Sequence, residues 1–188
     1  MHGLVNIFQL FLRVAMLKSP PQELPASEIV LAISIVFALF VGLVRYAIIG
    51  SEYYSLLRVV LELLIPAVIV YLLLFYFKKS GRFNQTFAAI CGSGAIIYAL
   101  ALPVLPAFFA SADSQHQPAI YIIIALDLWS VAVIAYILRH ALNVGFATGI
   151  SLAVVLVLLT LMLVESISPS KKLHQTDPAI SSNADDKL

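Results

Sequence analysis

The chain has 188 residues, of which 62% are hydrophobic and only 11% charged, and its formal net charge is +1. A soluble domain is about half apolar and about a quarter charged, so much of this protein's surface must face lipid instead of water. This composition excludes a soluble enzyme. Because no run of basic residues resembles a nucleic-acid footprint, we expect no nucleic-acid partner.

Residues 1–27 are predicted to form an amphipathic helix followed by a proline-rich linker. Polar side chains at His2, Asn6, Gln9 and Arg13 form one stripe of a helix, and apolar residues cover the rest. The pattern is typical of a helix that lies in the membrane interface or packs against the spans. A signal peptide is the competing interpretation, and the absence of a basic n-region disfavours it.

Residues 28–165 are predicted to form a bundle of five transmembrane helices. Crossing a hydrocarbon core of about 30 Å requires roughly 20 apolar residues. Ser27 is a candidate N-cap for the first span. Five stretches are long enough, at about 29–49, 57–77, 86–109, 119–138 and 144–164.

The third stretch and the end of the chain need separate interpretation. Pro103 and Pro106 predict a kink, with the last turn at the interface. A re-entrant segment at this place would reduce the count to four spans. Residues 166–188 are rich in Ser, Lys, Asp and Pro, which predicts a disordered polar tail.

Basic residues near the spans predict the orientation, because they favour the cytoplasmic side. With five crossings, six of them fall on the side of the N-terminus. The other side has Arg45 and Arg58, with two lysines in the tail. We therefore expect a cytoplasmic N-terminus and an outer C-terminus, in the inner membrane if the source is bacterial. The six are Arg13, Lys18, Lys78, Lys79, Arg82 and Arg139.

Arg58 and Glu62 are four residues apart and share one face of the second span. Arg45 ends the first span at the same interface and is placed to bridge to Glu62. The favoured interpretation is a structural charge cluster that fixes helix ends. A proton or ion site is the alternative.

Asp127 is the charged residue predicted to lie deepest in a span. It falls about eight residues into the fourth helix, roughly 12 Å from its start. Burying a carboxyl in lipid costs a few kcal/mol, so we expect Asp127 to face the bundle. It either orients the bundle by hydrogen bonding or serves as a protonatable site on a transport path or partner interface.

Small residues on one face of a helix allow close packing between spans. Two such faces occur, on the third and the fifth helix. We expect them to pack within the chain, with dimerisation as the less favoured interpretation. The predicted packing residues are Ala88, Gly92, Ala95, Ala99, Gly145, Gly149 and Ala153.

Sequence motifs for catalysis or metal binding do not occur. There is no glycine-rich phosphate loop, no His-Glu-xx-His and no Ser/His/Asp set, and the four histidines are scattered. The single cysteine, Cys91, allows no internal disulfide. We therefore expect a protein that is not an enzyme and holds no metal or cofactor.

Three segments of the chain share motifs with a known family. They resemble, in order, the interfacial helix with its proline linker, the third-span entry, and the fourth-span tryptophan with its basic exit, in short bacterial members of the Yip (Ypt/Rab-interacting protein) superfamily. The segments are Met16–Pro20 with Gln22–Pro25, Arg82–Thr86 followed by Cys91–Gly94 and Pro103, and Leu128–Ser130 followed by Leu138–Leu142.

This resemblance implies a five-helix bundle with a cytoplasmic N-terminus. Eukaryotic relatives act in vesicle traffic and contact small GTPases. The motifs of their N-terminal region do not occur in this sequence, so that activity is not transferred to this chain. For the short bacterial members the resemblance implies no biochemical role.

Two functions follow as hypotheses. The first is a Yip-like scaffold or assembly factor that acts in the bilayer by helix packing with a membrane-protein partner or in a homodimer. The alternative is a small transporter or channel subunit that uses Asp127 and Glu62 as protonatable groups.

Overall fold

Every regular element in the described part of the chain is helical. The computed structural model describes residues 2–50, 56–110 and 118–168. Two 3-10 turns connect helices, η1 (Pro21–Glu23) and η2 (Ser80–Arg82). The α-helices are α1 (His2–Ala15), α2 (Glu28–Ile49), α3 (Leu56–Tyr76), α4 (Phe83–Ala101), α5 (Leu105–Ala110), α6 (Pro118–Leu142) and α7 (Phe146–Ile167).

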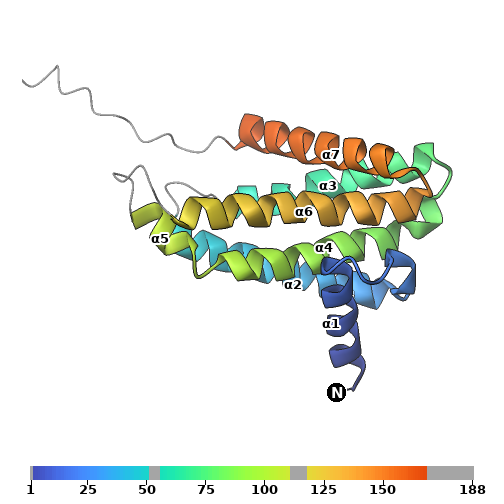
Figure 1. The fold of residues 1–188 in the computed structure, drawn as a ribbon, viewed down its shortest axis with the longest axis horizontal. Helices are drawn as coiled ribbons and strands as arrows, with labels where there is room; N and C mark the ends of the chain where they lie inside the picture. The colour runs from blue at the N-terminus through green and yellow to red at the C-terminus, as the bar shows by residue number, and fades with distance from the viewer. Residues whose placement is uncertain (1, 51–55, 111–117, 169–188) are drawn as a thin grey trace, which may run out of the picture.

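Five of these helices are long and apolar enough to cross a membrane: α2, α3, α4 together with η2, α6 and α7. They run side by side along the long axis of the molecule (Figure 1). Many of their large apolar side chains are exposed, as expected of a surface that faces lipid. The prediction of an all-α, multi-pass membrane bundle is therefore confirmed.

The five spans form a closed ring in the order α2, α4, α6, α7, α3, with α3 packing back against α2. Helix α4 is the innermost of the five. Half of the residues in its most apolar 18-residue stretch are buried, whereas 17–28% are buried in the corresponding stretches of the other four spans. Small residues explain this position, because they allow neighbouring backbones to approach α4 closely.

The helix ends agree with the predicted ends to within a few residues. Ser27 caps α2 as predicted, and its Oγ accepts a hydrogen bond of 3.2 Å from the amide of Ile29. Helices α1, α3 and α6 end on residues with positive φ, namely Leu17, Lys78 and Asn143. In each case the next residue donates its amide to a carbonyl five residues earlier, which closes the helix end.

Two expected boundaries differ from the structure. The stretch 86–109 is not one helix, because α4 stops at Ala101 and α5 begins at Leu105 after a turn. Pro103 lies in this turn and supplies no amide to continue the helix, so the predicted kink becomes a break. Ser166 and Ile167 are the last residues of α7 instead of the first of a tail. The rest of the predicted tail, 169–188, lies outside the described residues.

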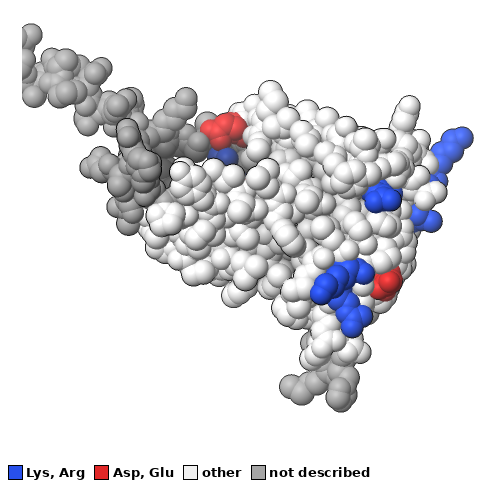
Figure 2. All heavy atoms as spheres, viewed as in Figure 1, with Lys and Arg blue, Asp and Glu red and all other residues white. Residues whose placement is uncertain are grey.

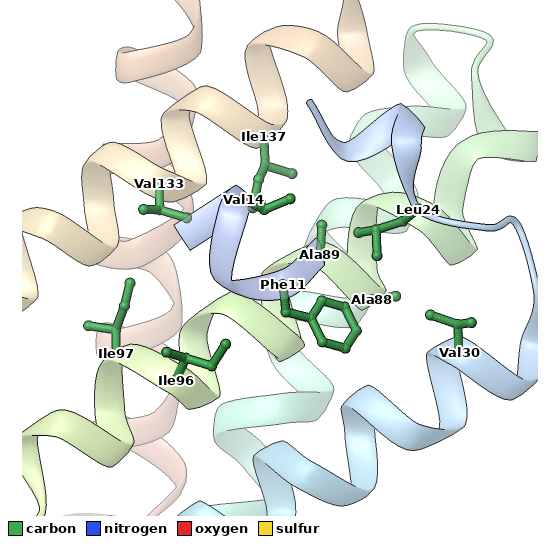
Figure 3. Close-up of a cluster of buried hydrophobic side chains, with 10 residues drawn as sticks. All are labelled: Phe11, Val14, Leu24, Val30, Ala88, Ala89, Ile96, Ile97, Val133 and Ile137. Carbon is green, nitrogen blue, oxygen red and sulfur yellow. The ribbon is translucent and has the colours of Figure 1, made fainter. Parts of the chain in front are cut away.

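Helix α1 runs across the spans, and its C-terminal turn packs against α4 and α6 (Figure 1). Phe11 and Val14 are almost fully buried and turn toward these two helices (Figure 3). Val5 and Phe8 remain exposed on the part that projects from the bundle. Of the two predicted placements for this amphipathic helix, the structure therefore shows its second half packed against the spans.

Charged side chains lie at the two ends of the bundle, with an uncharged face between them (Figure 2). The end nearest α1 holds most of the basic residues on this face. Arg82 on η2 donates a hydrogen bond of 3.1 Å to the carbonyl of Ala141, and Gln22 on η1 donates one of 2.6 Å to the carbonyl of His140. These bonds tie the linker and the loop between α3 and α4 to the C-terminal end of α6.

Candidate functional site: a cavity between the five spans

A cavity of about 340 Å³ lies inside the ring, and all five spans contribute to its wall. Most of the wall is aliphatic, and Phe87 and Tyr98 add aromatic surface. The polar residues among the lining side chains gather toward the end of the bundle opposite α1. They are Arg45 from α2, Glu62 from α3, Ser93 and Tyr98 from α4, Asp127 and Ser130 from α6, and Thr160 from α7.

The topology explains why these polar residues share one end. Successive spans run in opposite directions (Figure 1), so the last turns of α2, α4 and α7 lie beside the first turns of α3 and α6. Arg45 and Tyr98 lie in the last two turns of their helices, whereas Glu62 is the seventh residue of α3 and Asp127, the deeper of the two acids, is the tenth residue of α6. Pro66 also lines the cavity and interrupts the hydrogen bonding of α3 at this place.

Arg45, Glu62, Arg58 and Glu165 form a chain of ion pairs at this end. Arg45 Nη1 lies 3.4 Å from Glu62 Oε2, and Arg58 Nε lies 3.5 Å from Glu62 Oε1. Arg58 Nη1 reaches Glu165 Oε2 at 2.9 Å and thereby adds α7 to the chain. The predicted pairs of Glu62 with Arg45 and Arg58 are present, whereas the sequence alone did not indicate Glu165 as a partner.

Arg45 also contacts an aromatic ring. Its guanidinium carbon lies 5.2 Å from the centroid of the Tyr98 ring, a distance typical of a cation–π contact. The side chain of Arg45 is therefore held between Glu62 and Tyr98, at the wall of the cavity.

Asp127 lines the same cavity but does not join the chain of ion pairs. Within residues 2–50, 56–110 and 118–168, no hydrogen bond or ion pair reaches its carboxylate. The residue is exposed, although it lies inside a span. The expectation that Asp127 faces the bundle agrees with its place in the cavity wall. The expectation that a neighbouring helix satisfies it by hydrogen bonding stays a prediction, and Arg45 of α2 lies close enough to interact with its charge.

The small residues of α4 lie at its contacts with other helices. Ala88 and Ala95 are buried, Gly92 is buried against α1, and Ala99 is partly buried. A Cβ atom added to Gly92 would lie 2.5 Å from the ring of Phe11. Gly92 therefore provides the surface against which α1 packs, a role that its place in the stripe did not reveal.

The small residues of α7 divide into two groups. A Cβ atom on Gly149 would lie 2.9 Å from Arg139 Cβ and 3.0 Å from the carbonyl oxygen of Ala135, so α6 and α7 approach closely there. Ala153 is fully buried in the same contact. Gly145 does not take part, because it is exposed and a Cβ atom on it would meet nothing within 4 Å. It precedes α7 as its N-cap.

Two glycines that the sequence analysis did not select also shape the site. A Cβ atom on Gly42 would lie 2.8 Å from Val59 Cγ1, so Gly42 allows α2 and α3 to meet beside the cavity. Gly94 lines the cavity, and a Cβ atom on it would meet nothing within 4 Å. Gly42 follows Ser34 and Ala38 at intervals of four residues, so the sequence did contain a signal for it, whereas Gly94 has no small residue four positions away.

The arrangement of the described side chains offers binding and proton exchange. Among the described residues, no three His, Cys, Asp or Glu side chains gather as a metal site would require. The buried thiol of Cys91 has no acid–base partner among the lining residues that would activate it. An acid that faces a cavity inside a membrane bundle suits the binding of a proton or a cation.

No protein-family model, curated protein or solved structure matches this chain.

Proposed function

We propose that this protein is a small transporter or channel subunit that uses Asp127 and Glu62 as its ionisable groups. One observation carries the proposal: all five spans line a cavity in which Asp127 forms no ion pair within 4.0 Å among the described residues. Ionisable residues inside membrane bundles are costly, and they mark substrate paths and proton relays where they face a cavity.

The small-residue contacts support this proposal over a scaffold role. Gly92 packs against Phe11, and Gly149 packs against α6, so both predicted packing faces are covered within the chain at these positions. A scaffold or assembly factor with a membrane-protein partner or a homodimer remains a hypothesis from the sequence. No contact within residues 2–50, 56–110 and 118–168 favours it over transport.

Proton flux into liposomes tests the proposal. The full chain is reconstituted with a pH-sensitive dye trapped inside, and a potassium diffusion potential is imposed. We expect flux above that of empty liposomes, and we expect Asp127→Asn to reduce it at least tenfold because it removes the charge and keeps the shape.

Glu28→Gln is the matched control, since it removes an acid that lies outside the cavity at the start of α2. Its flux should equal that of the unmodified chain. Flux that is absent from the unmodified chain, or unchanged in Asp127→Asn, would refute a transport role for this residue.

For location, we propose the inner membrane of a bacterium, with the N-terminus in the cytoplasm. The end of the bundle from which η1 and η2 extend carries Lys78, Lys79, Arg82 and Arg139, as the positive-inside rule requires of a cytoplasmic face. Reporter fusions after residue 80 and after residue 175 should report opposite sides. The same side for both would contradict five crossings.

We also propose that the chain is a short bacterial relative of the Yip superfamily. Five spans preceded by an amphipathic helix support this relationship. The experimental structure of a short bacterial Yip protein tests it. The same ring order of spans, with its N-terminal helix across the third span, is the expected result, and a different ring order would refute the relationship.

A further inference from the structure

Among the described residues at the cavity end of the bundle, two basic side chains accompany three acidic ones. Among the described residues of this end, Arg45 and Arg58 are matched by Glu62 and Glu165 in one chain of ion pairs. Asp127 is a third acid and lies outside that chain. The described part of the site therefore has one negative charge more than positive charges, and that charge faces the cavity.

Arg45 is close enough to interact with the charge of Asp127, but it is shared with Glu62. Its guanidinium group pairs with Glu62 and lies over the ring of Tyr98, and no atoms of Arg45 and Asp127 come within 4.0 Å as an ion pair. A charge in an apolar setting strongly favours a counter-ion, because little water is present to solvate it. A single positive charge in the cavity would supply this counter-ion.

The rest of the cavity wall favours an apolar body on that cation. Beyond the polar end, the lining is mainly aliphatic, with the ring of Phe87 deeper in the bundle. A volume of 340 Å³ is about twice the ~150 Å³ that accommodates one benzene ring in an apolar protein cavity. It therefore suits a ligand on the order of a dozen non-hydrogen atoms.

We propose that the cavity binds a small organic cation, with its ammonium group at Asp127 and its apolar part between the spans. Tyr98 lines the same cavity and adds aromatic surface to it. This inference rests on the proposed function, because a transported solute must first bind, and it names the chemical class of that solute.

Three probes of equal size separate charge from shape. Benzyltrimethylammonium is the cation, neopentylbenzene is its uncharged isostere, and 4-methylbenzenesulfonate is an anion of similar volume. Binding to the full chain is measured by calorimetry in nanodiscs of zwitterionic lipid, with empty nanodiscs subtracted. We expect the cation to bind at least tenfold more tightly than either of the others.

Substitutions at Asp127 and at Gly94 test the two halves of the site, which are the acidic group and the apolar part of the cavity. Asp127→Asn should weaken cation binding at least tenfold, and Asp127→Glu should keep it within about threefold. Gly94→Leu should abolish binding while keeping the charge, because the added side chain enters open space in the cavity. Glu28→Gln should bind the cation as the unmodified chain does. The elution profile and thermal unfolding of each variant show whether it is folded.

Equal binding of the three probes, or cation binding that survives both Asp127→Asn and Gly94→Leu, would overturn the proposal. If Asp127→Asn does not fold, probe selectivity and the Gly94→Leu result decide. Cation binding that depends on Asp127, without any flux, would uphold this inference and refute the transport proposal. Flux that depends on Asp127, without cation binding, would do the reverse and leave the proton as the transported species.

Discussion

The ring of Phe11 lies directly against the backbone of Gly92, so that a methyl group at position 92 would fall 2.5 Å from the ring. Phe11 is 2% exposed and is enclosed by α2, α4 and η1, as Figure 3 shows for several of its neighbours. The ring therefore cannot rotate away from an added atom. The missing side chain at Gly92 therefore makes room for one of the contacts that attach α1 to the bundle.

Gly92→Ala should consequently displace α1 and destabilise the protein by about 1–3 kcal/mol, the usual cost of overpacking a filled core. The free energy of unfolding is measured by SDS titration in mixed micelles. In a Phe11→Ala background the ring is gone, so the same substitution at Gly92 should cost less. Equal costs in the two backgrounds would contradict a direct contact.

A second attachment of α1 is a hydrogen bond of 2.9 Å from Nε1 of Trp129 to the carbonyl oxygen of Ala15. The last carbonyls of a helix lack partners within the helix, so this bond satisfies one of them. Trp129→Phe removes the donor and keeps an aromatic ring. We expect a loss of about 1 kcal/mol at this contact.

The expected observable is faster tryptic cleavage after Arg13 and Lys18, both of which are exposed. The control is Tyr121→Phe, which changes an exposed aromatic residue of α6, the helix that also carries Trp129. It should leave the cleavage rate unchanged. If Trp129→Phe is cleaved no faster than this control, the hydrogen bond does not hold α1 in place.

Gly149 and Gly145 form a matched pair for a third prediction. Gly149→Ala places a methyl group 2.9 Å from Arg139 Cβ and 3.0 Å from the Ala135 carbonyl oxygen, so α6 and α7 must separate. We expect a loss of about 1–3 kcal/mol in the free energy of unfolding. Gly145→Ala adds the same atom in open space at an exposed residue with negative φ.

Thermal unfolding in detergent distinguishes the two variants. Gly149→Ala should unfold at a lower temperature than Gly145→Ala, because alanine at the N-cap Gly145 costs only about 0.5–1 kcal/mol, whereas Gly149→Ala overpacks the contact between α6 and α7. Equal destabilisation by both substitutions would show that both glycines serve the packing of α7, as the sequence pattern alone suggests.

These glycines also show which features of the structure can be predicted from the sequence. The spans follow from length and hydropathy, because lipid imposes one requirement on every crossing helix, and the Ser27 cap follows from local chemistry. Spacing also predicted the pairs of Glu62 with Arg45 and Arg58, since all three side chains end up at one interface.

Spacing could not predict which neighbour covers each small residue. Gly92, Gly145 and Gly149 look alike in a periodic pattern, yet one receives Phe11, one caps a helix and one meets α6. The cavity was equally hidden, because it depends on the ring order of the helices and on how closely α2 and α3 meet at Gly42. Both depend on shape between residues far apart in sequence.

The ion-pair chain provides the fourth prediction, because Glu62 holds two arginines from different helices. Its side chain is 30% exposed, and those of Arg45 and Arg58 are 21% and 15% exposed, so the pairs lie between the surface and the buried extremes. Glu62→Gln should lower the free energy of unfolding by about 1–3 kcal/mol, above the ~0–1 kcal/mol of a surface pair and below that of a fully buried one. Arg58 keeps Glu165 at 2.9 Å after this change, so the pair of Glu62 with Arg45 is the one to test.

A double-mutant cycle measures how much the pair of Arg45 and Glu62 contributes to stability. If the pair of Arg45 and Glu62 stabilises the protein, the two single variants should not be additive. The double variant Arg45→Gln/Glu62→Gln should then lower the free energy of unfolding clearly less than the sum of the two single variants. The free energies come from the same SDS titration, with Glu28→Gln as the variant that removes an acid outside the network. Strict additivity would mean that Arg45 and Glu62 act on stability separately, and the chain of ion pairs would then not be what joins α2 to α3 at the cavity.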